Sequence, residues 1–224
     1  MTTGDLEARS LVNFDALFQF RIADSLNNKP WTSKSSKVEN AFSDTDPRFS
    51  LGHFGPKHKL ILNKYSVVRP QFVLHTIEFE PQSDALNIHD MNAMWDAFSS
   101  LKSPHIAIFN CGHEADEDYE VPEVPFKHSI HRIGQDIDGP ALLRVYEGLR
   151  QSLALGPESP HNVILVKDWM VVIPRLKARN GMLSANAAAM IGMVWVNSEE
   201  QYNAWIEYGP MKALTDFGVP SKKK

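Results

Sequence analysis

Two histidines, His128 and His131, stand three residues apart in a short segment that also carries Lys127 and Arg132. An imidazole can act as a nucleophile or as a general acid or base at neutral pH, because its charge changes in that range. In an extended strand, residues three apart project from opposite faces. We therefore expect His131 at the surface. The residues alone leave His128 either as a reactive group or as a strand histidine with a satisfied hydrogen bond.

A strand-like apolar run over residues 106–109 precedes the histidines and ends at Asn110, Cys111 and Gly112. A turn at this place can present Asn110 and Gly112 to a ligand, although both residue types are also common in ordinary turns. No sequence feature would activate the Cys111 thiol. A buried, unreactive cysteine is therefore the expected state.

The segment between this turn and His128 is strongly acidic. Hard oxygen donors of this kind suit Mg²⁺, but a run of like charges is more often a solvated segment, and we favour that interpretation. Lys64 and Lys127 are candidate phosphate contacts, because ammonium groups bind phosphate as point charges; the alternative is that both are solvated lysines at strand ends. The carboxylates of the segment are Glu114, Asp116, Glu117, Asp118, Glu120 and Glu123.

Length and composition indicate a globular intracellular protein. The chain has 224 residues, 43% of them hydrophobic, which is enough for one sizeable core, and we treat residues 1–224 as a single domain. The net charge of -4 gives no overall basic field for nucleic acid. One cysteine excludes an intramolecular disulfide and favours a reducing compartment. No apolar run is long enough for a membrane span. We expect a cytoplasmic protein whose partner is a small molecule.

Helical and strand-like patterns alternate along the chain, and strand pairs separated by amphipathic helices predict an α+β fold with a mostly antiparallel sheet flanked by helices. Caps and turns mark most boundaries. The expected elements are a helix over residues 6–27, a long loop over 31–56, strands over 59–70 and 71–80, a helix capped by Asn87 or Asp90, the strand 106–109, the histidine strand, a helix opened by Gly139 and Pro140, a hairpin over 162–174 turning at Lys167 and Asp168, a turn at Asn180 and Gly181, a strand over 193–196, a helix capped by Ser198, and a short helix over 211–217.

Several segments resemble the fungal diadenosine tetraphosphate phosphorylases, also called ATP adenylyltransferases. The matching segments are collinear and cover most of the chain: residues 63–82 read NKYSVVRPQFVLHTIEFEPQ, residues 108–112 read IFNCG, residues 165–175 read LVKDWMVVIPR, and residues 207–220 read EYGPMKALTDFGVP. The resemblance implies a histidine-triad-like fold. It also implies cleavage of dinucleoside polyphosphates with phosphate through a nucleotidyl-histidine intermediate.

The family's active-site segment carries a short glycine and serine loop followed by the pattern His-x-His-x-Gln. Residues 125–130, PFKHSI, align with its last part. The resemblance makes His128 the nucleophile, whereas Phe126 replaces the first histidine and Ile130 replaces the glutamine. The acidic segment stands where the family has its serine loop. Phosphoryl transfer depends on positive charge and on hydrogen-bond donors around the phosphates, so these replacements weaken the expected phosphate site.

Three hypotheses follow for the function. In the first, His128 attacks an α-phosphorus of a nucleotide with Mg²⁺ as the cofactor, and Lys64, Asn110, Gly112 and Lys127 contact the substrate. In the second, a cavity lined by Phe126 and Ile130 binds a less charged organic molecule, and His128 acts as acid or base in an isomerisation or cyclisation. In the third, the chain is a nucleotide-binding protein without catalytic activity.

Overall fold

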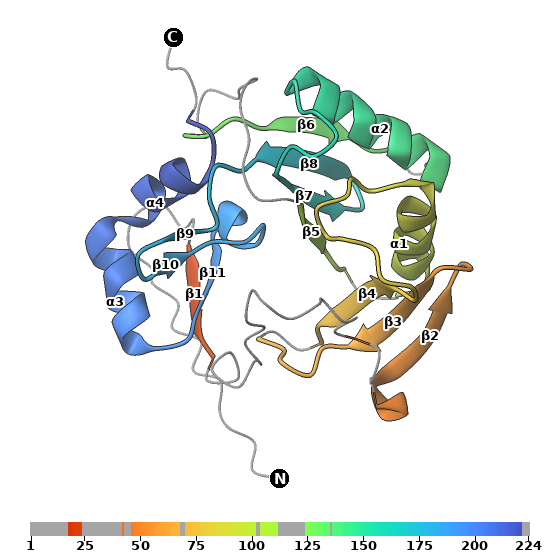
Figure 1. The fold of residues 1–224 in the computed structure, drawn as a ribbon, viewed down its shortest axis with the longest axis horizontal. Coiled ribbons are helices and arrows are strands. Elements are labelled where there is room, and N and C mark those ends of the chain that lie inside the picture. The colour runs from red at the N-terminus through yellow and green to blue at the C-terminus, as the bar shows by residue number, and fades with distance from the viewer. Residues whose placement is uncertain are drawn as a thin grey trace.

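The computed structural model describes residues 18–23, 42, 46–67, 70–101, 104–111, 124–134 and 136–220. Within these ranges the fold is α+β, as predicted. It contains one four-stranded and one three-stranded antiparallel sheet, a short antiparallel hairpin, and one parallel strand pair. Helices flank these sheets (Figure 1). No helix in the described ranges has both the length and the apolar character that a membrane crossing needs.

The four-stranded sheet is the central element of the fold. Its strands are β5 (Ala107–Cys111), β6 (Ser129–Arg132), β7 (His161–Val166) and β8 (Trp169–Pro174). The order β5-β7-β8-β6 puts the β7–β8 hairpin in the middle and leaves β5 and β6 at the edges. The hairpin turns at Lys167 and Asp168, as the sequence predicts, because two apolar runs flank these two polar residues.

Both faces of this sheet are covered, which explains why its central strands are apolar throughout. On one face, Val163 and Val172 pack with residues of helices α1 (Ile88–Ser100) and α2 (Gly139–Ser152). On the opposite face, Ile164 and Ile173 join a second hydrophobic cluster with the C-terminal part of the chain. We call these the helix face and the inner face.

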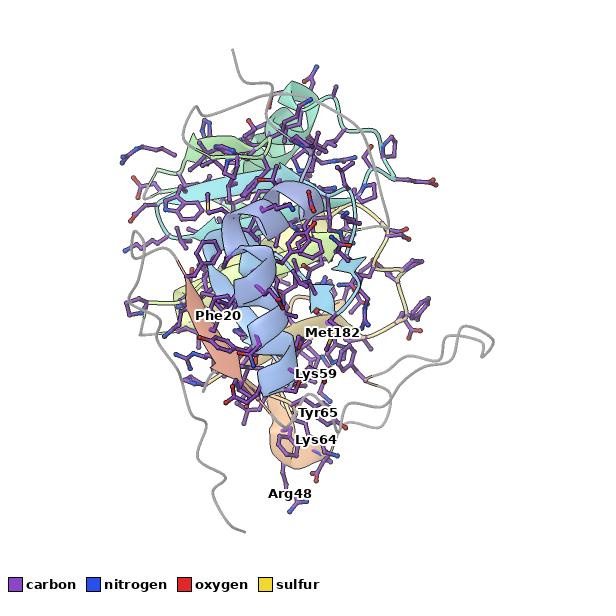
Figure 2. All side chains as sticks on the ribbon, turned by 90° about the vertical axis from the view of Figure 1, so that its left-hand side faces the viewer. Phe20, Arg48, Lys59, Lys64, Tyr65 and Met182 are labelled. Carbon is purple, nitrogen blue, oxygen red and sulfur yellow. The ribbon has the colours of Figure 1, made fainter. Side chains whose placement is uncertain are left out.

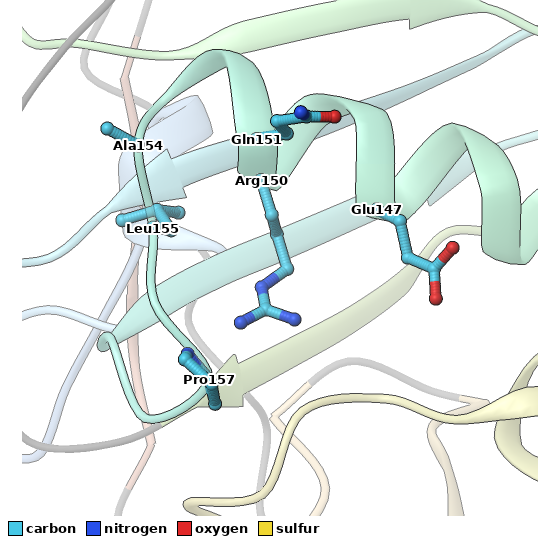
Figure 3. Close-up of a pocket in the computed structure, with 6 residues that line it drawn as sticks. All are labelled: Glu147, Arg150, Gln151, Ala154, Leu155 and Pro157. Carbon is cyan, nitrogen blue, oxygen red and sulfur yellow. The ribbon is translucent and has the colours of Figure 1, made fainter.

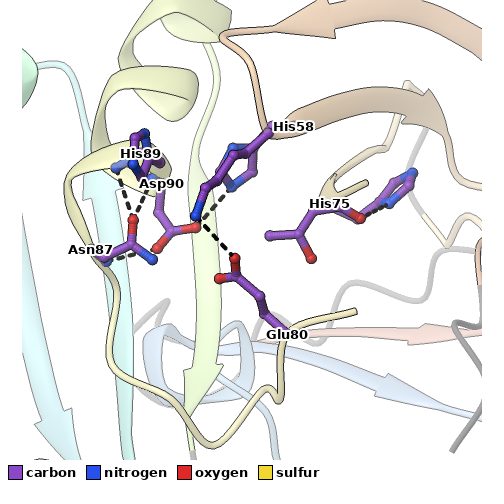
Figure 4. A network of polar contacts seen from close by, with 8 residues as sticks. His58, His75, Glu80, Asn87, His89 and Asp90 are labelled. Atoms are coloured by element: carbon purple, nitrogen blue, oxygen red, sulfur yellow. Dashed lines mark hydrogen bonds and ion pairs between the residues drawn. The ribbon is translucent and has the colours of Figure 1, made fainter. Parts of the chain in front are cut away.

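The three-stranded sheet lies beside helix α1. It contains β2 (Ser50–Phe54), β3 (His58–Leu62) and β4 (Phe72–Thr76) in that order. The side chain of Asn87 caps α1 in a capping box with Asp90, as expected for one of the two predicted caps. The buried His58 reaches Asp90, with 2.8 Å between Nε2 and Oδ1 (Figure 4). This contact fixes the sheet to the start of the helix.

The C-terminal part of the chain packs around a pair of parallel strands, β1 (Gln19–Ile22) and β11 (Met193–Val196). Helices α3 (Glu199–Tyr208) and α4 (Pro210–Phe217) follow, with Ser198 as the cap of α3 and Gly218 after α4, as predicted. The remaining elements are the hairpin of β9 (Arg179–Asn180) and β10 (Leu183–Ser184), and two 3₁₀ turns, η2 (Pro47–Phe49) and η3 (Ala189–Ile191).

Two expectations about the N-terminal part are wrong where the structure describes it. The predicted helix over residues 6–27 contains strand β1 instead; Phe18, Phe20 and Ile22 also alternate with period two, and the edge of β11 supplies backbone partners. The predicted loop over residues 31–56 ends in η2 and β2, which pairs with β3 despite a register shift between Ser50 and Gly52. The rest of the predicted helix and most of the loop lie outside the described residues.

Candidate active site

His128 lies directly before strand β6, with 7% of its surface exposed. Its Nδ1 atom is 3.0 Å from the backbone carbonyl oxygen of Phe126. A carbonyl oxygen only accepts hydrogen bonds, so Nδ1 carries the proton and donates it. The neutral ring therefore has its lone pair on Nε2, for which the structure gives no protein partner in the described ranges. This is the tautomer that a histidine needs to act as a nucleophile or base through Nε2.

Phe126 holds the carbonyl that orients His128. Its side chain is only 4% exposed and belongs to the hydrophobic cluster of the inner face. The backbone of Phe126 forms a β-bridge with Pro220, and its ring contacts that of His128 edge-on at a centroid distance of 6.2 Å. Phe126 is therefore a core residue that positions His128. As a core side chain it is not an open wall for a ligand.

Lys127 is only 1% exposed, so the interpretation of this residue as a solvated lysine is wrong. Its backbone amide donates to the Val219 carbonyl at 2.8 Å. Together with the β-bridge between Phe126 and Pro220, this hydrogen bond forms a backbone seam between the two segments. These contacts explain the burial, because they place this segment beneath residues 218–220.

The strand register sets the relation between His128 and Asn110. Asn110 pairs with Asn162, Asn162 pairs with Ile173, and His128 lies one residue before the partner of Val172. All four side chains thus share one row on the inner face. Two strands separate Asn110 from His128, which corresponds to about 14 Å at the usual strand spacing. The structure puts the two predicted site residues on one face but at opposite edges.

Two asparagines of this row differ in their hydrogen bonding. The Asn110 side-chain oxygen accepts a hydrogen bond from the Ala187 amide at 2.7 Å, so it fastens the segment that leads into η3. Asn162, which sequence reasoning missed, is 1% exposed, and its side-chain oxygen has no partner in the described part of the chain. A polar residue within the apolar run of β7 was the signal that could have identified it.

The two faces of β6 differ as the alternation predicts. Ser129 points toward the helix face, where its hydroxyl is 2.8 Å from that of Ser152. Ile130 shares the inner-face direction with His128 and keeps 52% of its surface exposed. His131 is exposed, which confirms the surface position that its spacing from His128 predicts.

Lys64 lies outside the four-stranded sheet that His128 borders. Lys64 follows β3, is exposed, and has its ammonium 5.7 Å from the centre of the Tyr65 ring (Figure 2). Gly112 and the acidic segment 114–123 lie outside the described residues. The contacts of these residues with a substrate therefore stay predictions.

A second histidine, His161, has the opposite environment from His128. It is fully buried on the helix face, with Nε2 2.7 Å from the Tyr146 hydroxyl and Nδ1 2.6 Å from the Ser159 carbonyl oxygen. Burial lowers the pKa of His161 to about 4. Both ring nitrogens are engaged and the ring is neutral, so His161 supports the core and has no free atom for chemistry.

The cavity that the structure describes lies apart from the predicted site residues. A shallow cavity of about 350 Å³ lies at the end of α2, lined by Glu147, Arg150, Gln151, Ala154, Leu155 and Pro157 (Figure 3). It contains none of the predicted site residues. Across the described ranges, no three His, Cys, Asp or Glu side chains gather closely enough to hold a metal ion.

Comparisons with known proteins agree with the architecture. The family model described as "Ap4A phosphorylase N-terminal domain" matches residues 7–119, and the one described as "ATP adenylyltransferase C-terminal domain" matches residues 122–220. The chain is 26% identical over 269 residues to diadenosine 5',5'''-P1,P4-tetraphosphate phosphorylase 2 of Saccharomyces cerevisiae, covering 89% of this chain and 82% of that protein.

Solved structures of yeast Ap4A phosphorylase Apa2 have the same fold. The complex with Ap4A gives a TM-score of 0.74 at 23% identity, covering 92% of this chain and 86% of that chain. The complex with AMP gives 0.72 at 23% identity, covering 92% and 85%.

Proposed function

The chain belongs to the ATP adenylyltransferase/Ap4A phosphorylase family, and from that premise we propose that it is a nucleotidyltransferase of dinucleoside polyphosphates with His128 as its nucleophile. The observation that carries the proposal is the hydrogen bond from His128 Nδ1 to the Phe126 carbonyl, which leaves the Nε2 lone pair for attack. The solved complexes with Ap4A and AMP support nucleotides as the ligand class.

Two displacements at phosphorus make up the proposed reaction. In the first, Nε2 forms a bond to the α-phosphorus and the bond from that phosphorus to its bridging oxygen breaks, which releases a nucleotide. The ring then carries a positive charge, and the Phe126 carbonyl stabilises it through the Nδ1 proton. In the second, an oxygen of inorganic phosphate attacks the same phosphorus, and the bond to Nε2 breaks. The buried backbone seam around residues 126–128 keeps the ring oriented through both steps.

In this proposal, Mg²⁺ binds together with the phosphates of the substrate. The ion usually binds through one or two carboxylates together with substrate phosphates, and it then neutralises phosphate charge. The described residues do not form a protein cage for it by themselves. We therefore assign no step of the reaction to the ion.

The first test is replacement of the nucleophile. We expect His128→Ala to lower the rate of Ap4A phosphorolysis by at least about 1,000-fold, because the proposed mechanism takes its attacking atom from the His128 ring. His131→Ala is the matched control, since His131 is exposed on the other face of β6, and its rate should stay within about twofold of wild type. Product formation is measured by chromatography. Unchanged turnover by His128→Ala would remove this residue from the mechanism.

Nucleotide binding is tested separately by thermal unfolding with AMP, ATP and Ap4A, with and without Mg²⁺. A ligand that binds only the folded state must raise the melting temperature. The absence of a shift with every nucleotide would exclude the nucleotidyltransferase and the non-catalytic nucleotide-binding alternative together.

A second candidate function is acid–base catalysis by His128 on a less charged organic molecule. Ile130, which is 52% exposed beside His128 where the family has glutamine, favours it. The burial of Phe126 in the core weakens the apolar cavity that this function needs. Stabilisation by apolar compounds together with no response to nucleotides would support this second function over the first.

A further inference from the structure

Strands β1 and β11 lie side by side, with α3 on one side of them (Figure 1). Phe20 and Val194 face that side, where the Phe20 ring packs against Tyr202 and Trp205 of α3. Arg21 and Trp195 are direct partners in the parallel register. Since neighbours along a strand alternate, both side chains project from the face that is turned away from α3.

This face carries two hydrogen-bond donors without acceptors. The Nε atom of Arg21 and the indole Nε1 atom of Trp195 are both buried, and neither has a hydrogen-bond partner in the part of the chain that the structure describes. Within the same part, Arg21 forms no ion pair. Buried donors in folded proteins almost always have an acceptor, so two adjacent ones that lack it require an explanation.

The chemistry of the two donors indicates what is missing. A guanidinium is charged at all physiological pH values and presents its N–H groups in a planar fork that matches two oxygens of one phosphate or carboxylate. An indole N–H is a neutral donor that can only bind an acceptor. Side by side, the two groups can hold different oxygens of one tetrahedral anion.

We propose that Arg21 and Trp195 form a phosphate subsite of this protein. The proposal rests on the proposed function, because a dinucleoside polyphosphate phosphorylase handles phosphate in two forms: inorganic phosphate and the phosphates of the nucleotide. Both present the same oxygens to the two donors. Arg21 supplies the positive charge and Trp195 supplies a second, directed donor, and together they hold the anion on the β1–β11 strand pair.

Binding is measured by calorimetric titration of the full chain with inorganic phosphate, with AMP and with adenosine. Arg21→Gln removes the charge, and Trp195→Phe removes only the indole donor while keeping an aromatic ring. We expect Arg21→Gln to weaken phosphate binding at least tenfold and Trp195→Phe to weaken it several-fold, while adenosine does not bind at this subsite. Arg48→Gln and Trp95→Phe are the matched controls, because Arg48 is an exposed arginine paired with Asp46 and Trp95 lies on α1.

The ligands separate the two phosphate sources. Loss of phosphate binding in both variants assigns the subsite to inorganic phosphate, whereas loss of AMP binding alone assigns it to the nucleotide. Equal affinities of wild type, Arg21→Gln and Trp195→Phe for both anions would overturn the proposal. If the subsite exists, His128→Ala still binds phosphate, even if the protein proves to have no nucleotide turnover. A failure of the subsite proposal can therefore be distinguished from a failure of the proposed function. Trp195→Phe, which keeps an aromatic ring, keeps the test valid if Arg21→Gln does not fold.

Discussion

At the scale of single residues, the ring nitrogens of two histidines at the four-stranded sheet, His128 and His161, meet different groups. The Nδ1 of His128 donates to a carbonyl and its Nε2 remains available, whereas both nitrogens of His161 are engaged by Tyr146 and by the Ser159 carbonyl. Residue type therefore does not determine reactivity here. The hydrogen-bond partners of each ring do.

The buried His161 makes the stability of the fold depend on pH. Burial lowers its pKa to about 4, so the unfolded chain binds a proton more readily than the folded chain. Stability from this group is complete above pH of about 6.5 and is lost progressively as pH falls toward about 4. The loss reaches roughly 3 kcal/mol when the pH has fallen to about 4.

Urea unfolding at pH 7 and pH 4.5 checks this prediction. His161→Gln should show a smaller difference in unfolding free energy between the two pH values than wild type, because glutamine does not titrate. His131→Gln is the control, since the exposed His131 should leave the difference unchanged. An identical pH dependence in wild type and His161→Gln would contradict the prediction that His161 causes the loss of stability at low pH.

At the scale of elements, the start of α1 is a junction between two parts of the fold. One oxygen of Asp90 accepts from the Asn87 amide at 2.7 Å, and the other lies 2.8 Å from His58 of β3. The same carboxylate thus closes the capping box and fastens the three-stranded sheet (Figure 4).

Removal of this carboxylate should affect both elements. We expect Asp90→Ala to lower the unfolding free energy by about 2–4 kcal/mol, because it removes a cap and leaves the buried His58 without its acceptor. Asp96→Ala, on the exposed side of the same helix, is the control and should change stability by less than about 0.5 kcal/mol. Chemical denaturation measures the unfolding free energy of both variants. Equal effects of the two substitutions would contradict the role of Asp90 as the contact that joins the helix and the sheet.

At the scale of the whole molecule, the C-terminal residues complete the candidate site. Gly218 follows α4 and lies against Phe126, whose carbonyl orients His128. A Cβ atom on Gly218 would come within 2.7 Å of the Phe126 Cβ, which is closer than van der Waals contact permits. Gly218 therefore has to pack closely on the segment that carries His128, the proposed nucleophile.

Gly218→Ala tests this long-range contact. We expect a loss of about 1–3 kcal/mol in stability, as for other overpacked cores, and a fall in turnover of at least about tenfold because the Phe126 carbonyl shifts. Gly148→Ala is the matched control, since its Cβ would meet nothing within 4 Å on the exposed side of α2. Thermal unfolding and the phosphorolysis assay are the measurements. Normal turnover in a destabilised Gly218→Ala would show that this contact supports stability but not catalysis.

The sequence by itself determined the features that depend on near neighbours. The β7–β8 hairpin, the caps of α1 and α3, and the outward direction of His131 follow from turn residues, capping side chains and strand alternation, all of which act over a few positions. The collinear family segments also predicted the family assignment, which the family models confirm, and the candidate role of His128 stays a prediction.

Only the tertiary structure decided the features that depend on distant partners. Residues 19–22 form a strand because the edge of β11 accepts them, although their apolar spacing also fits a helix. Asn110 accepts a hydrogen bond from the Ala187 amide, 77 residues away, and Phe126 packs closely against Gly218. Backbone groups and apolar surfaces take whichever partner the fold brings to them, and a local pattern carries no information about which partner that is.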